Sequence, residues 1–300
     1  MNTSLDPPIY AWILTLNRLP TIEEYNICFQ CLDKDSQTKV TNILARSGDQ
    51  YAAWSCLCGR LLPHIVMNQR EIPISAWRIV GNEDGSKPSI LCPAYEKKLG
   101  YNISHDGLLV AMAFALGPAA AVANVGCDVR RIHLPSSIST SVFVESLSHK
   151  ITPLERSFLS TDLGDEVIMR RIFILWTLKE AYLKAIGQPL RLGFDWNRIE
   201  CDIPNETITV DGRILCGWEF RLFKANVNVH PRKDPRSEQV YQVTAAIYRG
   251  GESTSFVWNQ ELKLDPWLRF LTVDSVMDAV WDLQYPHITS FLKLKLDQQR

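Results

Sequence analysis

The sequence predicts an α+β protein built from two closely packed lobes. Its 300 residues are 46% hydrophobic and 22% charged, which is enough apolar chain to bury a large core. Patterns typical of helices and of strands are mixed in both halves of the chain. The join near Asn124 has no segment rich in Pro, Gly or Ser, so we expect no flexible linker there. The expected division is an N-terminal lobe at 1–123, a C-terminal lobe at 124–255 and a C-terminal extension at 256–300.

Helices and strands alternate along the first half of the chain. Thr21 followed by Glu24 is typical of the capped start of a helix, because each side chain can bond the other's backbone amide. Pro63 is expected to kink or interrupt a later helix, since proline has no amide for the preceding turn. The predicted elements are a strand at 11–16, helices at 21–32, from Asp35 and at 50–69, a strand at 76–80 and a turn at 82–85.

Residues 108–123 form a charge-free stretch that approaches the length of a membrane span, which needs about 20 apolar residues. Gly117-Pro118 is a turn dipeptide at its centre and divides it into two apolar runs of strand length. We therefore expect a hairpin of two buried strands here, rather than a membrane helix.

The second half repeats the mixture of helix and strand. Its predicted elements are a strand at 125–129, helices from Ser139 and Pro153, a long helix at 165–186, strands near 199, 207, 218 and 240–248, a loop at 229–238, and a further helix with a polar tail over 267–300.

The charge balance argues against whole classes of partner. Thirty-two Lys and Arg against 33 Asp and Glu give a formal charge of −1, so we expect neither nucleic acid nor an anionic membrane as a partner. Residues 1–12 show no basic region leading into an apolar run, so we expect a cytoplasmic protein. Eight cysteines then favour reduced, buried thiols over disulfides or a zinc site. Any anion site must be local.

The long predicted helix presents two charges from an otherwise apolar rod. At about 100° per residue, Glu180 and Lys184 fall within one narrow stripe of its surface. An ordinary surface ion pair, worth about 0.2–0.5 kcal/mol, would account for that spacing. The alternative is a partly buried carboxylate and ammonium that face a ligand between the lobes.

Asp128 lies inside a strand predicted to be mostly buried, where a carboxylate is out of place unless it is hydrogen-bonded or holds a metal. With Glu180 it would form the sparse carboxylate site typical of Mg²⁺, which takes further ligands from water and substrate phosphates. Spacing alone leaves this pairing open. Side chains able to bind phosphate, each with an ordinary structural role as the alternative, are Lys87, Ser104, His105, Arg60 and Arg46.

Taken together, these motifs resemble the ordered set of the surfactin-type 4′-phosphopantetheinyl transferases. GSKP at 85–88 is similar to the family's Gly-Lys-Pro turn with a serine inserted, YNISH at 101–105 to its Asn-x-Ser-His strand end, and VGCDV at 125–129 to its Gly-x-Asp segment. FILWTLKEAYLKAIG at 173–187 matches its Trp-x-x-Lys-Glu-Ala-x-x-Lys-x-x-Gly helix closely. The resemblance covers residues 14–248.

The resemblance implies a pseudo-twofold pair of similar α/β lobes that bind coenzyme A and Mg²⁺ in the cleft between them. It implies transfer of the 4′-phosphopantetheine arm of coenzyme A to a serine of an apo carrier protein, with release of adenosine 3′,5′-bisphosphate. Carriers of the fatty-acid, polyketide, peptide-synthetase and aminoadipate-reductase types all fit. A complete site within one chain implies a monomer. The alternative is a non-catalytic module on the same fold that binds coenzyme A or carrier proteins.

The resemblance also assigns roles to individual residues. Asp128 and Glu180 would bind Mg²⁺, and Glu180 would also help to deprotonate the serine, directly or through a water. Lys184 would stabilise the charge that develops on the phosphate. The implied coenzyme A contacts are Lys87, Ser104 and His105 for its phosphates, with Arg60 and then Arg46 for the 3′-phosphate.

Arg130 is the main departure from the family's pattern. Many members carry a second acidic residue at this position, two residues after the Asp128 equivalent. Because a cation cannot ligate Mg²⁺, we expect either a water in that place or Arg130 turned toward solvent or toward the acidic carrier.

Overall fold

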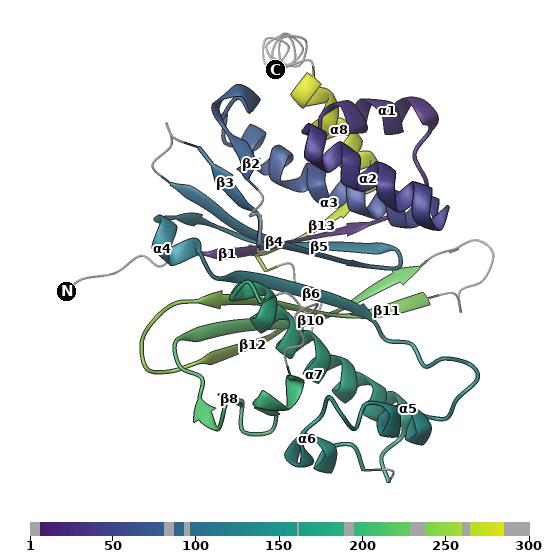
Figure 1. Ribbon diagram of the computed structural model, residues 1–300, viewed down its shortest axis with the longest axis vertical. Helices are drawn as coiled ribbons and strands as arrows, with labels where there is room; N and C mark the ends of the chain where they lie inside the picture. Colours follow the sequence, from purple (N-terminus) through teal and green to yellow (C-terminus); the bar gives the residue numbers. More distant parts are fainter. Residues whose placement is uncertain are drawn as a thin grey trace, which may run out of the picture.

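A computed structural model describes residues 7–80, 87–92, 97–160, 162–188, 195–228, 238–259 and 265–284. Two four-stranded sheets form the centre of the molecule, and helices cover the outer face of each (Figure 1). The strand order is β13-β1-β5-β4 in the N-terminal lobe and β12-β10-β11-β6 in the C-terminal lobe. The predicted α+β class and the two packed lobes are therefore confirmed.

The N-terminal lobe follows the predicted order of helix and strand. The Thr21–Glu24 capping box begins the first helix as its sequence indicates. The third helix, α3, continues through Pro63 without interruption. The elements of this lobe are β1 (Ile9–Thr15), α1 (Ile22–Gln30), α2 (Lys34–Ser47), α3 (Gln50–Gln69), β2 (Arg78–Val80), β3 (Ser89–Leu91), β4 (Lys98–Asp106), β5 (Leu109–Gly117) and α4 (Ala119–Val122).

The hairpin predicted within residues 108–123 is wrong in its position. Strand β5 takes up the first apolar run, and its partner is β4, which precedes it and is joined to it by a turn where Gly107 has φ of 52°. Pro118 instead begins the short helix α4, since its fixed φ suits a helix start and alanines follow it. The stretch lacks charges because β5 is buried on both faces, by helices on one side and by the other sheet on the opposite side.

The C-terminal lobe is organised around the long helix α7, which packs across β6 and β11. Figure 1 shows α7 lying along the outer face of this sheet, with α5 and α6 near its start. The elements are β6 (Val125–Arg131), α5 (Thr140–Ser146), α6 (Pro153–Ser157), α7 (Asp165–Ala185), β7 (Ile199–Asp202), β8 (Thr207–Val210), β9 (Arg213–Ile214), β10 (Trp218–Asn228), β11 (Glu238–Tyr248) and β12 (Ser255–Asn259).

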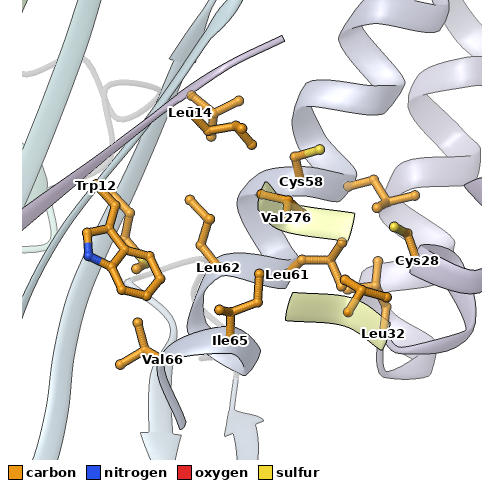
Figure 2. Packing of buried hydrophobic residues seen from close by; sticks show 14 of the residues in the cluster. Trp12, Leu14, Cys28, Leu32, Cys58, Leu61, Leu62, Ile65, Val66 and Val276 are labelled. Carbon is orange, nitrogen blue, oxygen red and sulfur yellow. The ribbon is translucent and has the colours of Figure 1, made fainter. Parts of the chain in front are cut away.

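The last described segment returns to the N-terminal lobe. Strand β13 (Leu268–Thr272) pairs in parallel with β1, and α8 (Val273–Gln284) packs beside α1 and α3. Figure 2 shows Val276 of α8 among Cys28, Cys58 and Leu61, inside the core of that lobe. The sequence predicted a helix here but missed the strand, and the expected extension from residue 256 includes most of β12 and completes both sheets.

Strand β6 is an edge strand whose outer side faces β4 of the other lobe. Side chains of β4 replace backbone pairing there: Asn102 Oδ1 accepts a 2.9 Å hydrogen bond from the Cys127 amide, and Asp106 Oδ2 accepts one of 2.7 Å from the Arg131 amide. Because residues 102, 104 and 106 share one face of a strand, Ser104 also points at β6. Side chains therefore join these two edge strands, beside the apolar core that the faces of the two sheets share.

The other predictions concern thiols and membranes. All eight cysteines are free, and burial raises the pKa of the Cys28 thiol to about 12, which suits an unreactive core residue. No described helix is both long enough and apolar enough to cross a bilayer. The predicted turn at 82–85, nearly all of the loop at 229–238 and the polar tail from residue 285 lie outside the described residues.

Candidate active site

Asp128 is the centre of a polar cluster that draws on both lobes. Its side chain is fully buried in β6, and Oδ1 accepts hydrogen bonds from Ser104 Oγ at 2.9 Å and from Lys184 Nζ at 2.6 Å. Lys184 Nζ also donates to Ser104 Oγ at 2.9 Å, which closes a triangle of three side chains from β4, β6 and α7. The structure therefore brings together three of the residues that the sequence singled out.

Glu180 lies one helical turn before Lys184 and is only 1% exposed. Its Oε2 atom is buried and has no hydrogen-bond partner among the described residues. Burial, followed by the negative charge of Asp128, raises the pKa of Glu180 to about 7. A carboxylate poised near neutrality can accept a proton at physiological pH.

The position of Glu180 and Lys184 depends on a close approach between α7 and β6. A Cβ atom at Gly126 would lie 1.9 Å from the carbonyl oxygen of Ala181, so only glycine lets the helix lie this near the strand. One turn earlier, Thr244 Oγ1 of β11 donates to Thr177 Oγ1 at 2.8 Å and ties the same helix face to the sheet. The predicted stripe of α7 thus faces strands β6 and β11, and its Lys184 reaches Asp128.

Asp128 and Glu180 also fit a bound divalent cation. Carboxylate oxygens are the ligands that Mg²⁺ prefers, and the unpartnered Oε2 of Glu180 is a buried oxygen that such an ion would satisfy. Within the described ranges, no group of three or more acidic, His or Cys side chains is arranged as a metal site. The described chain therefore fits a metal held by two carboxylates, with the remaining ligands from water and substrate.

A pocket of about 360 Å³ lies next to this cluster, on the side of the N-terminal lobe. Arg60 and His105 both line it, together with Ser36 and Lys39 of α2. Arg60 Nη1 donates to Ser36 Oγ at 3.1 Å, while its buried Nε has no partner among the described residues. Partial desolvation, and then the charge of Lys184, lowers the pKa of His105. The pocket thus offers cationic and neutral donors to an anion, and the carboxylates of Asp33 and Asp35 line it as well.

Two predicted coenzyme A contacts lie elsewhere in the structure. Lys87 donates its ammonium to the carbonyls of Ala123 and Val125, at 3.0 and 2.6 Å, and burial lowers its pKa to about 8. Arg46 is exposed in the last turn of α2, which puts it about 15 Å along the helix from Ser36 of the pocket. Gly85 and Ser86 of the GSKP motif lie outside the described residues.

Arg130 differs from both expectations, since it turns inward to Asp128 instead of leaving room for water or pointing away. Its Nε donates to Asp128 Oδ2 at 3.2 Å, and its guanidinium lies 5.5 Å from the centre of the Trp176 ring. Lys150 Nζ lies 4.7 Å from the same ring centre. Sequence reasoning missed these contacts of Trp176 and Lys150. The alternation of a strand, which places residues 128 and 130 on one face, was the available signal.

Lys179, next to Glu180 in the sequence, has a structural role: it forms a buried ion pair with Glu155. It is 1% exposed, and its Nζ donates to Glu155 Oε2 at 2.7 Å and to the carbonyls of Lys150 and Trp196. Glu155 in turn accepts a hydrogen bond from the Cys201 amide. Through this buried ion pair α7 holds α6 and β7 against the outer side of the lobe.

A family model and a curated relative both show similarity to 4′-phosphopantetheinyl transferases. The family model of the 4′-phosphopantetheinyl transferase superfamily matches residues 124–242. The chain is 34% identical to the 4′-phosphopantetheinyl transferase pptA of Paxillus involutus over 238 residues, which cover 77% of this chain and 84% of that protein.

More distant relatives carry a more specific name. The L-aminoadipate-semialdehyde dehydrogenase-phosphopantetheinyl transferase of Xenopus laevis is 26% identical over 64% of this chain and 60% of its own length. The human protein of the same name is 24% identical over 68% of this chain and 62% of its own length.

Proposed function

The chain belongs to the 4′-phosphopantetheinyl transferase superfamily, and from this membership we propose that it modifies apo carrier proteins. It transfers the 4′-phosphopantetheine arm of coenzyme A to a serine hydroxyl of the carrier and releases adenosine 3′,5′-bisphosphate. The observation that carries the proposal is the buried cluster of Asp128, Lys184 and Ser104 beside Glu180, whose Oε2 atom has no partner among the described residues.

The reaction requires one bond to form at phosphorus and another to break. The serine oxygen bonds to the phosphorus that carries the pantetheine arm, and the bond from that phosphorus to the bridging oxygen breaks. The hydroxyl proton passes to Glu180, directly or through a water, because a carboxylate within reach of the serine can act as the general base. Lys184 stabilises the negative charge that develops on the phosphate oxygens.

Asp128 and Glu180 would hold Mg²⁺ in this scheme. The ion supplies charge neutralisation at the diphosphate when it is bound. Oδ1 of Asp128 already accepts hydrogen bonds from Ser104 and Lys184, whereas Oδ2 accepts only from Arg130 among the described residues, so Oδ2 is the oxygen with a lone pair left for a metal. Ser104 and Lys184 orient the carboxylate from the other lobe and from α7.

The 360 Å³ pocket would receive the nucleotide end of coenzyme A. We assign Arg60 to the 3′-phosphate and His105, the residue after Ser104 in β4, to the diphosphate side. Ser36 and Lys39 extend the same wall and join the proposed contacts. Arg46 and Lys87 have no place in this assignment, because one lies at the far end of α2 and the other is engaged with backbone carbonyls.

The proposal extends to the subfamily, the oligomeric state, the cellular location and the class of carrier. The surfactin type fits, because the carboxylates and the pocket come from one chain, and the same fact supports a monomer. Eight free cysteines support a cytoplasmic location. Relatives named for aminoadipate-semialdehyde dehydrogenase support carriers of the aminoadipate-reductase type, alongside fatty-acid, polyketide and peptide-synthetase carriers.

Intact-mass spectrometry of an apo carrier tests this function. The carrier is incubated with the protein, coenzyme A and Mg²⁺, and a parallel reaction contains EDTA in place of the metal. A metal-dependent mass gain equal to one phosphopantetheine arm, located on the carrier serine, is expected. No gain on carriers of all four types, from a folded protein that binds coenzyme A, would contradict the enzyme and favour the non-catalytic binding module.

A further inference from the structure

Arg130 is held in a fixed place beside the centre of the site. Residues 128 and 130 lie on the same face of β6, and Arg130 Nε donates to the fully buried Asp128 carboxylate at 3.2 Å. Its own side chain is 32% exposed, so one end of the residue is anchored while the other reaches solvent. An arginine held in this way loses little further freedom when it binds a ligand.

The Trp176 ring supports the guanidinium from α7. The Arg130 guanidinium carbon lies 5.5 Å from the ring centre, a distance typical of a cation–π contact. Lys150 lies 4.7 Å from the same ring and 5.3 Å from the ring of Trp196, so two cations share this aromatic platform. The Trp176 ring therefore holds two positive charges, those of Arg130 and Lys150, beside the carboxylates of Asp128 and Glu180.

The donors of Arg130 are only partly used. A guanidinium has five N–H donors, and its Nη1 and Nη2 donate no hydrogen bond to any residue in the described ranges. Around Asp128 and Glu180 stand three cationic side chains, those of Lys184, Arg130 and Lys150. The cluster has one more positive group than negative groups even when both carboxylates are ionised, which favours an incoming anion.

We propose that Arg130 is a ligand of the coenzyme A diphosphate, with its terminal nitrogens forming a fork on the phosphate oxygens. The inference rests on the proposed function, which brings a diphosphate to Asp128 and Lys184. Arginine binds phosphate through two parallel hydrogen bonds, which a lysine cannot reproduce. A fixed cation here supplies part of the charge neutralisation that binding otherwise draws from a metal.

Calorimetric titration of coenzyme A in EDTA isolates this contribution from the metal and from turnover. The variant Arg130→Gln removes the charge, and Arg130→Lys keeps the charge but loses the fork. The matched control is Arg131→Gln, the next residue of β6, which faces the opposite side of the strand. Dephospho-coenzyme A, which keeps the diphosphate, and adenosine 3′-monophosphate, which lacks it, report which phosphate is bound.

The expected result is a weakening of about tenfold for Arg130→Gln with both coenzyme A and dephospho-coenzyme A, and a smaller one for Arg130→Lys. Binding of adenosine 3′-monophosphate should be unchanged, and Arg131→Gln should match the wild type in every titration. Thermal unfolding of each variant verifies that the fold is intact. Should Arg130→Gln unfold, the Arg130→Lys titration decides by the same comparison.

Three outcomes would overturn the inference. Equal binding of coenzyme A by the wild type and a folded Arg130→Gln would remove Arg130 from the diphosphate while leaving the proposed function intact. Equal weakening by Arg130→Gln and Arg131→Gln would show a general effect of charge rather than a ligand. Absence of coenzyme A binding by the wild type, with or without Mg²⁺, would remove the proposed function as well.

Discussion

Ser104 of the N-terminal lobe donates a 2.9 Å hydrogen bond to Asp128 of the C-terminal lobe, across the line where two sheet edges meet. Lys184 Nζ lies within hydrogen-bond distance of both groups. The candidate site is therefore assembled by the contact between lobes. Changes that shift one lobe against the other should lower activity even where they leave every site residue in place.

Glu180→Gln should abolish transfer and leave the fold intact. The amide keeps the shape of the side chain but cannot accept the serine proton or offer a charged oxygen, so we expect the rate to fall by at least about 100-fold. Intact-mass kinetics of carrier modification measure this. Glu166→Gln, an exposed change in the first turn of the same helix, is the control and should keep the wild-type rate. A near-normal rate for Glu180→Gln would remove it from the mechanism.

Gly126→Ala should both destabilise the protein and reduce transfer. The added methyl would lie 1.9 Å from the Ala181 carbonyl oxygen, so α7 must move away from β6 and carry Glu180 with it. Overpacking of this kind costs about 1–3 kcal/mol or more. Urea unfolding measures the loss. Gly164→Ala, where a Cβ meets nothing within 4 Å, should cost only about 0.5–1 kcal/mol, because alanine is a poorer N-cap for α7 than glycine. Equal stability of the two variants would contradict the close approach.

Lys179→Met should leave the buried carboxylate of Glu155 without its cation. Removing one partner of a buried pair costs about 3–5 kcal/mol, and this pair is 1% and 0% exposed. Adding Glu155→Gln to Lys179→Met should recover part of the loss, since no unpaired charge then remains. The half-exposed pair of Arg198 with Asp211 is the control, and Arg198→Met should cost far less than Lys179→Met because solvent screens an exposed pair. Equal costs for the two single variants, measured by urea unfolding, would mean that burial does not matter here.

His64 should make the protein less stable in mild acid. Its ring is 4% exposed against Trp77, neither nitrogen has a partner among the described residues, and burial lowers its pKa to about 4. The unfolded chain takes up this proton near pH 6.5 and the folded chain only near pH 4. The full stability is therefore present above about pH 6.5, and up to about 3 kcal/mol is lost as the pH falls toward 4.

Unfolding free energies at pH 7 and pH 4.5 test the role of His64. His64→Leu should reduce the difference between the two values, because leucine has no proton to gain. His133→Leu changes an exposed histidine and should retain the wild-type pH dependence. The assignment fails if both variants behave alike.

Lys87→Met should act on stability more than on coenzyme A. The ammonium donates to two carbonyls where the chain enters β6, and losing these hydrogen bonds should cost about 2 kcal/mol. Thermal unfolding and the apparent KM for coenzyme A separate the two roles. An unchanged unfolding free energy with a raised KM would return Lys87 to the phosphate site that its motif suggested.

The positions of the candidate residues agree with the sequence prediction most closely where the pattern was local. The stripe on the long helix placed Glu180 beside Lys184, and a carboxylate in a buried strand marked Asp128 as unusual. Both features follow from the fixed geometry of single elements, a helix and a strand. The mixture of helix and strand in each half likewise predicted the α+β class.

What the sequence did not predict depends on contacts between distant elements. Strand β13 is short and gains its place from β1, more than 250 positions earlier, so its own pattern gave little signal. The inward turn of Arg130 depends on Trp176 from another element. Lys87 was assigned by its motif, whereas the carbonyls that it binds are brought to it by the fold.

The return of β13 and α8 to the N-terminal lobe has a consequence during synthesis. Chains usually fold from the N-terminus as they emerge from the ribosome. Here β1 cannot pair with β13 until Leu268–Thr272 has been made, and the core around Cys28 and Leu61 is incomplete until Val276 has been made. The lobe that is translated first therefore closes after the other lobe has emerged, and a nascent chain carries its open apolar surface until Leu268–Thr272 and Val276 have been made.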